Sequence, residues 1–213
     1  MKLYQSVGPN PRVVLMYIAE KGLTIDREWI DLMGGANRRA PYTDIAPFGQ
    51  LPLLETDDGT HIFESVAICE YLEELEGEPP LIGTTPEERA ETRMLIRRLD
   101  FDIIMPMTTA FRAAEGKALF ESRMRLVPEG ADGLKACARD GLESFDAWMA
   151  DREWLAGDRF TLADIVLFCF VEFGAMVGQP LPDGLANLAA WKDRIATRPS
   201  AAASADDKVG VAT

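Results

Sequence analysis

Hydrophobic positions in the first third of the chain predict a small sheet with two helices. A short apolar run at 2–5 and an alternating pattern at 23–30 have strand character, and the apolar spacing between Asn10 and Gly22 is that of a helix. Two apolar runs within 53–63, joined by Asp-Asp-Gly, predict a hairpin, and an amphipathic helix follows over 65–76. The order of these elements predicts a sheet with one parallel pair and an antiparallel edge.

After a linker rich in Pro and Gly at 77–85, the pattern is helical throughout. Thr85-Pro86-Glu87-Glu88 is a capping box, and the helix that it opens is expected to kink at Pro106. Three more helices are predicted, at 132–149, from Thr161 through the apolar run 165–173, and at 185–197.

These patterns predict two domains of different class. Residues 1–78 form an α/β domain, and residues 86–200 form an all-α helical bundle. The Ala- and Ser-rich residues 201–213 are expected to form a loosely ordered tail.

Composition and charge exclude several classes of partner. The chain has 213 residues, 47% of them apolar, and its net charge is −13 from 35 acidic and 22 basic residues. Such an excess of acid disfavours nucleic acid and anionic membranes as partners. No apolar run approaches the about 18 residues of a membrane span, and the N-terminus lacks a signal-peptide core. We therefore expect the protein to remain in the cytoplasm.

Cysteine and histidine usage argues against metal and redox centres. Cys69, Cys137 and Cys169 form no close pair, which excludes a CxxC motif and disfavours a zinc site. All three are predicted to be core residues. The chain contains one histidine, His61, which disfavours a Ser-His-Asp triad and a multi-histidine metal site. We expect no metal.

The densest chemical signal lies around the predicted hairpin. Pro52 stands just before a strand, so the main chain of Leu51 is free to pair with an extended peptide ligand. Ser65 opens the next helix, where its hydroxyl and free N–H groups suit a carboxylate, and Glu64 suits an ammonium. Together these groups fit the amino-acid end of a small peptide. Each motif alone also has a purely structural interpretation, in which Ser65 is only an N-cap and Pro52 only begins a strand.

From residue 1 to about 199 the chain resembles a cytosolic glutathione transferase. The resemblance is carried by Gly49-Gln50-Leu51-Pro52, Glu64-Ser65-Val66-Ala67-Ile68 and Gly157-Asp158-Arg159-Phe160-Thr161-Leu162-Ala163-Asp164. It implies a thioredoxin-like N-terminal domain, an all-helical C-terminal domain and a cis bond before Pro52. It also implies that Leu51 pairs with the cysteinyl part of glutathione, beside Gln50, while Glu64 and Ser65 hold the γ-glutamyl end. The family usually has Val where this chain has Leu51.

The same resemblance puts the thiol-activating group within Ser6-Val7-Gly8-Pro9-Asn10-Pro11. Ionising a thiol at neutral pH needs roughly 2 kcal/mol of thiolate stabilisation, which one hydrogen-bond donor and a helix N-terminus supply. Asn10 is the first candidate, Ser6 the second, and Tyr4, within the first strand, the third. Asn10 is alternatively a plain N-cap. Because no cysteine precedes Cys69, the chain resembles bacterial classes with a cysteine-free site.

Further residues are implied at the two ends of the substrate site. Arg38 is the candidate partner of the glycyl carboxylate of glutathione, with Arg39 and Arg12 as alternatives. The second substrate is expected in a cleft between the domains, lined by residues of the helix that spans Pro106, which are Met105, Met107, Phe111 and Arg112.

The resemblance implies a glutathione transferase. Glutathione, as a co-substrate, would be held as a thiolate and attack an apolar electrophile, and the protein would be a homodimer. Two alternatives remain open. One is a glutathione-dependent disulfide reductase without its own cysteine, and the other is a non-catalytic binding protein with the same fold.

Overall fold

Four short strands form one mixed sheet in the first part of the chain. The sheet has the order β2-β1-β3-β4, in which β1 is parallel to β2 and antiparallel to β3, and β3 is antiparallel to β4. The strands are β1 (Lys2–Gln5), β2 (Asp26–Trp29), β3 (Leu53–Glu55) and β4 (His61–Phe63). The predicted parallel pair and antiparallel edge are both present.

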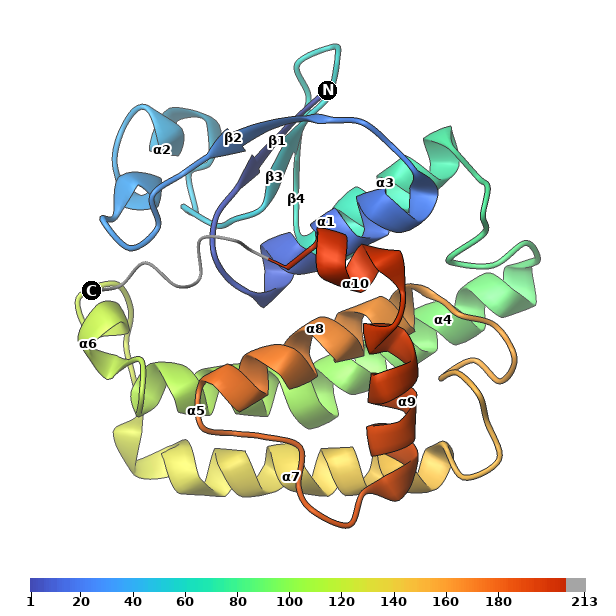
Figure 1. Cartoon of the computed structure of the whole chain (residues 1–213). Helices are drawn as coiled ribbons and strands as arrows, with labels where there is room; N and C mark the ends of the chain where they lie inside the picture. The colour runs from blue at the N-terminus through green and yellow to red at the C-terminus, as the bar shows by residue number, and fades with distance from the viewer. Residues whose placement is uncertain (206–213) are drawn as a thin grey trace. The chain divides into compact units, whose positions relative to one another are not determined.

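The computed structural model describes residues 1–205, which fall into two compact units (Figure 1). The first unit contains Met1–Leu81 together with the described residues from Thr197 onward, and the second contains Ile82–Ala196. The predicted order of an α/β part followed by a helical part is thus observed. No helix in residues 1–205 is long and apolar enough to cross a membrane.

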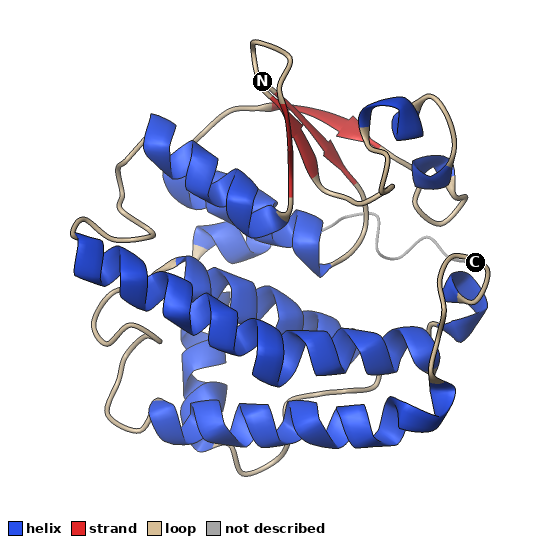
Figure 2. Cartoon of the chain, turned by 180° about the vertical axis from the view of Figure 1, so that it is seen from behind, coloured by secondary structure: helices blue, strands red, loops and turns tan. Residues whose placement is uncertain are grey.

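Helices cover both faces of the sheet. Helices α1 (Pro9–Lys21) and α3 (Ser65–Leu75) lie side by side across one face (Figures 1 and 2). The segment between β2 and β3 contains η1 (Ala36–Arg38) and α2 (Tyr42–Ile45). Tyr42 of α2 and Ala46, which follows α2, pack in one cluster with Tyr4 and Leu53, which pair across β1 and β3.

Helix α1 begins two residues earlier than the sequence pattern predicted. Its N-cap is Gly8, with φ 125°, and Pro9 occupies the first helical position. Asn10, interpreted above as an N-cap, therefore lies inside the first turn. That expectation was wrong because both Pro9 and Pro11 suit a helix start, and the glycine conformation at residue 8 selects the earlier one.

The chain returns to the first unit through helix α10 (Pro199–Ala203), which packs on α1. The Arg198 guanidinium donates to both carboxylate oxygens of Glu20, at 2.7 Å each. Ser200 and Ala201 are buried. Residues 201–203 thus belong to a helix, contrary to the expectation of a loose tail, and Arg198 and Ser200 hold the start of this helix on Glu20. Residues 206–213 lie outside the described residues.

The second unit is helical throughout its described elements (Figure 2). These are α4 (Pro86–Leu99), the π-helical turn η2 (Asp100–Ile104), α5 (Met105–Ala113), α6 (Lys117–Phe120), η3 (Pro128–Gly130), α7 (Ala131–Trp148), α8 (Leu162–Met176) and α9 (Ala186–Ala196). Where a kink was expected at Pro106, the structure has the π-helical turn η2 just before this residue. Pro106 is the second residue of α5, directly after this π-helical turn, in a helical path that continues from α4.

Two features determine the packing of this unit. Every residue of α8 from Leu162 to Val171 is buried, as the apolar run predicted. Helix α7 approaches η2 so closely that a Cβ atom at Gly141 would lie 2.3 Å from the carbonyl oxygen of Asp102. A glycine is therefore required at residue 141.

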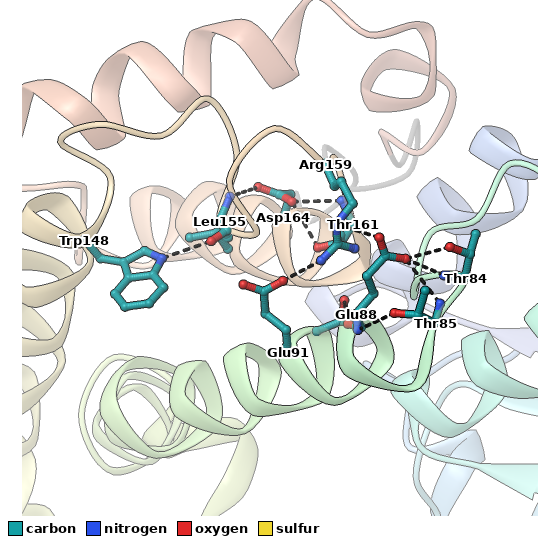
Figure 3. A network of polar contacts seen from close by, with 10 residues as sticks. Thr84, Thr85, Glu88, Glu91, Trp148, Leu155, Arg159, Thr161 and Asp164 are labelled. Carbon is teal, nitrogen blue, oxygen red and sulfur yellow. Dashed lines mark hydrogen bonds and ion pairs between the residues drawn. The ribbon is translucent and has the colours of Figure 1, made fainter.

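Two capped helix starts lie side by side in the second unit (Figure 3). At α4, the Glu88 backbone N–H donates to the Thr85 hydroxyl at 3.2 Å, and the Glu88 carboxylate accepts from the Thr85 N–H at 3.3 Å. At α8, the Thr161 N–H donates to Asp164 Oδ2 at 2.9 Å. Arg159 forms ion pairs with Glu88 and Glu91 and so connects the two helices.

Asp164 is the centre of this network. Its Oδ1 accepts from the Leu155 N–H and from the Trp191 indole N–H, each at 2.9 Å, while Oδ2 accepts from the Thr161 N–H at 2.9 Å and from the Thr161 hydroxyl at 3.2 Å. The side chain is fully buried, and this burial raises the pKa of Asp164 although the four hydrogen bonds favour the ionised carboxylate. The sequence-based interpretation of Thr161 and Asp164 as a folding element fits this arrangement.

Candidate functional site

Three segments of the first unit meet at one end of the sheet. The register pairs Leu53 with both Tyr4 and Phe63. The strands β1 and β4 end where β3 begins. Ser6 after β1, Leu51 before β3 and Ser65 after β4 therefore lie at the same end of the sheet. The sheet topology therefore gathers the segments that the sequence pattern singled out.

A hydrogen bond joins two of the predicted site residues directly. The Ser65 hydroxyl donates to Asn10 Oδ1 at 3.2 Å, across 55 residues of sequence. Ser65 is buried and Asn10 is partly buried. Within residues 1–205 the amide nitrogen Nδ2 of Asn10 has no hydrogen-bond partner, so it is a free donor at the start of α1.

The start of α3 is open to an external acceptor. Its N-cap is Glu64, and no side chain caps the helix. The first helical bond runs from the Ile68 N–H to the Glu64 carbonyl at 3.0 Å. Across the described part of the chain, the N–H groups of Ser65, Val66 and Ala67 have no partner. This end of α3 therefore favours an anion.

Glu64 has an unusual backbone conformation. Its φ is 68°, and no other non-glycine residue of the described chain has a positive φ. Such a conformation costs about 1–3 kcal/mol and is concentrated at functional sites. The exposed Glu64 carboxylate stands beside the open helix start, so a ligand group that carries both an ammonium and a carboxylate fits here.

The main chain of Leu51 is also open. The Leu51–Pro52 bond is cis, as the family resemblance implied. Neither the N–H nor the C=O of Leu51 has a hydrogen-bond partner among residues 1–205. The Leu51 side chain packs on the cluster that contains Tyr4 and Leu53. The exposed Gln50 precedes them.

The other two candidates for thiol activation are engaged in structural contacts. Ser6 is buried, and its hydroxyl accepts from the Leu32 N–H at 3.4 Å. Tyr4 lies in β1 and donates to the Glu55 carboxylate at 2.6 Å, and this hydrogen bond, together with burial, raises the pKa of Tyr4 to about 12. Asn10 is thus the candidate whose side chain contacts Ser65.

The arginine candidates lie in different surroundings. Arg38 is exposed, and its Nη1 donates to the Phe48 carbonyl at 3.1 Å, beside the loop that leads to Leu51. Arg39 donates to the Gly34 carbonyl at 3.0 Å. Arg12 is partly buried in the first turn of α1. Arg38 is therefore the arginine attached to the Leu51 loop.

The residues expected to line a second-substrate pocket have different environments within the second unit. Met105 is 56% exposed at the start of α5. The Phe111 ring packs edge-on against Phe120 and Phe173, with ring centroids 5.9 Å and 5.2 Å away. The Arg112 guanidinium lies 5.8 Å from the Phe120 ring centroid, and burial lowers the pKa of Arg112.

A cavity of about 320 Å³ lies elsewhere in the same unit. Met107, Lys135, Arg139 and Leu142 line it together with residues 178–183. Of the residues predicted for the second-substrate pocket, only Met107 contributes to this cavity.

One cysteine prediction was wrong. Cys69 and Cys169 are buried as expected, but Cys137 is exposed. Helix α7 buries the face that contains Ala138, Gly141 and Leu142, and Cys137 lies one position off it. Within residues 1–205, no group of three His, Cys, Asp or Glu side chains is arranged to hold a metal ion.

Sequence reasoning missed two residues that hold the Leu51 loop. The Asn37 amide donates to the Gly49 carbonyl at 2.7 Å, and the Tyr42 hydroxyl donates to the Gln50 carbonyl at 2.6 Å. Both side chains are buried. An aromatic residue within an otherwise irregular polar segment was the available signal for Tyr42.

Comparisons with known proteins agree with this architecture. Family models described as "Glutathione S-transferase, N-terminal domain" and "Glutathione S-transferase, C-terminal domain" match residues 7–75 and 134–199. The chain is 32% identical to glutathione S-transferase 2 of Saccharomyces cerevisiae over 195 residues, which are 91% of this chain and 84% of that protein.

Two further similarities differ in extent. The crystal structure of a glutathione S-transferase domain-containing protein of Marinobacter aquaeolei VT8 has 35% identity and a TM-score of 0.88, over 94% of this chain and 99% of that one. Elongation factor 1-gamma of Homo sapiens is 33% identical over 136 residues, which are 64% of this chain and 29% of that protein.

Proposed function

The chain belongs to the glutathione S-transferase family, and we propose that it binds glutathione as a thiolate and transfers it to an apolar electrophile. The observation that carries this proposal is the contact between Ser65 and Asn10. It joins the residue proposed to hold the γ-glutamyl carboxylate to the residue proposed to stabilise the sulfur. Both lie at uncapped helix starts.

The γ-glutamyl end of glutathione occupies the start of α3 in this proposal. The carboxylate accepts hydrogen bonds from the free N–H groups and from the Ser65 hydroxyl, and the ammonium pairs with Glu64. Support comes from the absence of any cap on α3 within the described residues. These local donors overcome the repulsion that a net charge of −13 exerts on an anionic ligand.

The cysteinyl part pairs with the main chain of Leu51, whose N–H and C=O both lack partners within residues 1–205. The sulfur then lies near Asn10, whose free amide nitrogen Nδ2 donates to the thiolate. The positive end of the α1 helix dipole also stabilises the thiolate. Arg38 attracts the glycyl carboxylate. Ser6 has a supporting role in this proposal, because its hydroxyl already holds the Leu32 N–H.

The transfer step needs no further group on the protein. The sulfur lone pair attacks the electrophilic carbon, and the leaving group departs with its bonding electrons. The protein accelerates this step by maintaining the thiolate and by holding both reactants close together. Met105, Phe111 and Arg112 remain the proposed contacts of the electrophile.

We also propose that the protein is a homodimer. Met94 and Phe101 lie seven residues apart along α4 and η2, and each is at least half exposed. Light scattering tests this: Phe101→Glu should halve the mass, whereas Met176→Glu, at a position 61% exposed on α8, should not. An unchanged mass for Phe101→Glu would exclude this face.

Calorimetry and two activity assays test the catalytic proposal. We expect saturable glutathione binding and conjugation of a chloronitrobenzene, with less activity on a low-molecular-weight disulfide. Higher activity on the disulfide would assign the reductase alternative. Binding without either activity would favour the non-catalytic alternative, with which the partial similarity to elongation factor 1-gamma is compatible. No binding would reject the proposal.

A further inference from the structure

Three consecutive carbonyl groups of the loop before β3 are each held by a different side chain. The carbonyl of Phe48 accepts from Arg38, that of Gly49 from Asn37, and that of Gln50 from Tyr42, at 3.1, 2.7 and 2.6 Å. All three donors belong to the short segment from η1 to the start of α2. This segment therefore fixes the path of the loop immediately before Leu51.

Tyr42 is the donor closest to the proposed ligand groups. The Gln50 carbonyl and the Leu51 N–H belong to the same peptide unit, which is planar and trans. In such a unit the C=O and the N–H point in opposite directions. A hydroxyl that holds the carbonyl on one side therefore directs the Leu51 N–H to the other side, where no partner lies among the described residues.

The Tyr42 hydroxyl is a fixed donor. Its ring is 4% exposed and packs edge-on against Tyr4 with the centroids 6.2 Å apart, in the cluster that also contains Ala46 and Leu53. Burial raises the pKa of Tyr42, so its hydroxyl, already protonated at neutral pH, remains a donor well above neutral pH. The donor is thus held by the core of the unit.

The loop has little freedom to move away from this donor. Gly49 has φ 61°, and a Cβ atom there would lie 2.5 Å from the carbonyl oxygen of Asn37. The loop main chain is in direct contact with η1 at this point. Loss of one hydrogen bond should therefore change the orientation of the Gln50–Leu51 peptide without displacing the loop.

We infer that Tyr42 is a positioning residue for glutathione, which orients the Leu51 N–H toward the cysteinyl carbonyl through the Gln50–Leu51 peptide. This inference rests on the proposed function and deepens it. Tyr42 touches neither the ligand nor the sulfur. Its effect is confined to the affinity for glutathione and leaves thiol ionisation and the electrophile unchanged.

Tyr42→Phe tests the inference because it removes the hydroxyl and retains the ring. We expect the Kd and the KM for glutathione to rise about tenfold, as loss of one oriented hydrogen bond predicts. We expect unchanged kcat at saturating glutathione, unchanged KM for the electrophile and an unchanged pKa of the bound thiol. A general loss of structure would instead lower kcat and the melting temperature.

Tyr4→Phe is the matched control. It removes the hydroxyl of the neighbouring ring, which donates to Glu55 and not to the loop, so the KM for glutathione should stay the same. An equal rise in both variants, or unchanged glutathione affinity in Tyr42→Phe, would overturn the inference while the proposed function stands. Wild-type protein that does not bind glutathione overturns both.

A second measurement does not depend on the stability of the variant. In the wild-type protein, the amide resonance of Leu51 should shift when glutathione is added, because its N–H gains an acceptor. The resonance of Leu54, within the sheet, should move less. A Leu51 resonance that stays in place at saturating glutathione would contradict both the inference and the Leu51 contact of the proposed function.

Discussion

Helices α3 and α8 both start next to a hydroxyl side chain and a carboxylate, yet the two starts are built in opposite ways. At α8, Thr161 and Asp164 bond to each other, and Asp164 also accepts from Leu155 and Trp191. At α3, the Ser65 hydroxyl turns to Asn10, Glu64 is exposed, and the first N–H groups have no partner within residues 1–205.

The comparison separates two uses of the same chemistry. A carboxylate from the chain itself occupies the start of α8, where it stabilises the fold. At the start of α3 the first N–H groups have no partner within residues 1–205 and Glu64 has a positive φ, and we propose that a carboxylate from outside binds there. We therefore expect substitutions at the two starts to have opposite consequences for stability and for glutathione binding.

The largest effect is expected from Asp164→Ala. The substitution leaves the N–H groups of Leu155, Thr161 and Trp191 buried without an acceptor, so the free energy of unfolding should fall by about 3–5 kcal/mol. Urea denaturation measures the loss. Asp164→Asn retains one carbonyl oxygen and should lose less. If both variants kept wild-type stability, the assigned role of Asp164 would be wrong.

Ser65→Ala should have the reverse profile. Glutathione affinity should fall by about 1–3 kcal/mol, because a charge-assisted hydrogen bond to the carboxylate is lost. The free energy of unfolding should change by less than about 1 kcal/mol, because the Ser65 hydroxyl caps no helix N–H. Calorimetry and urea denaturation give the two values. Unchanged glutathione affinity would remove the ligand from the start of α3.

Asn10→Ala addresses the sulfur. The lost donor should raise the pKa of the bound glutathione thiol by about one unit, which corresponds to about 1.4 kcal/mol. The sign follows because the amide stabilises the thiolate, so its removal favours the protonated form. Titration of the thiolate absorbance measures the shift, with Asn10→Gln as a control that retains the amide. An unshifted titration would transfer the role to Ser6 or to main-chain donors.

Thr85→Ala should give the smallest effect. It removes the hydroxyl that accepts from the Glu88 N–H at the exposed start of α4, for a loss of about 1 kcal/mol in unfolding free energy. Glutathione affinity should not change. A change in affinity would show that the two kinds of helix start are not independent.

The sequence predicted those features whose causes are local. Apolar spacing located the helices, and the pairs Thr85–Glu88 and Thr161–Asp164 marked two helix starts, because three-residue spacing is enough for a capping box. The motifs around Leu51 and Ser65 indicated two segments whose main-chain groups lack partners within residues 1–205, and we propose that both segments face the ligand. Pattern alone did not show that Ser65 contacts Asn10, since 55 residues separate them.

What the sequence did not reveal depends on distant contacts. Helix α10 is held by a pair between Arg198 and Glu20, 178 residues apart. The hydroxyl of Tyr42 acts on a main-chain carbonyl, and a main-chain acceptor has no residue signature. The exposure of Cys137 depends on the exact face that α7 buries, which an apolar pattern defines only to within a residue.

A crystal structure of the protein with bound glutathione tests the central claim most directly. The account predicts the γ-glutamyl carboxylate on the Ser65 hydroxyl and the N–H groups that follow it, the cysteinyl main chain on Leu51, and the sulfur beside the amide of Asn10. Glutathione bound elsewhere, with the N–H groups at the start of α3 still without an acceptor, would contradict it.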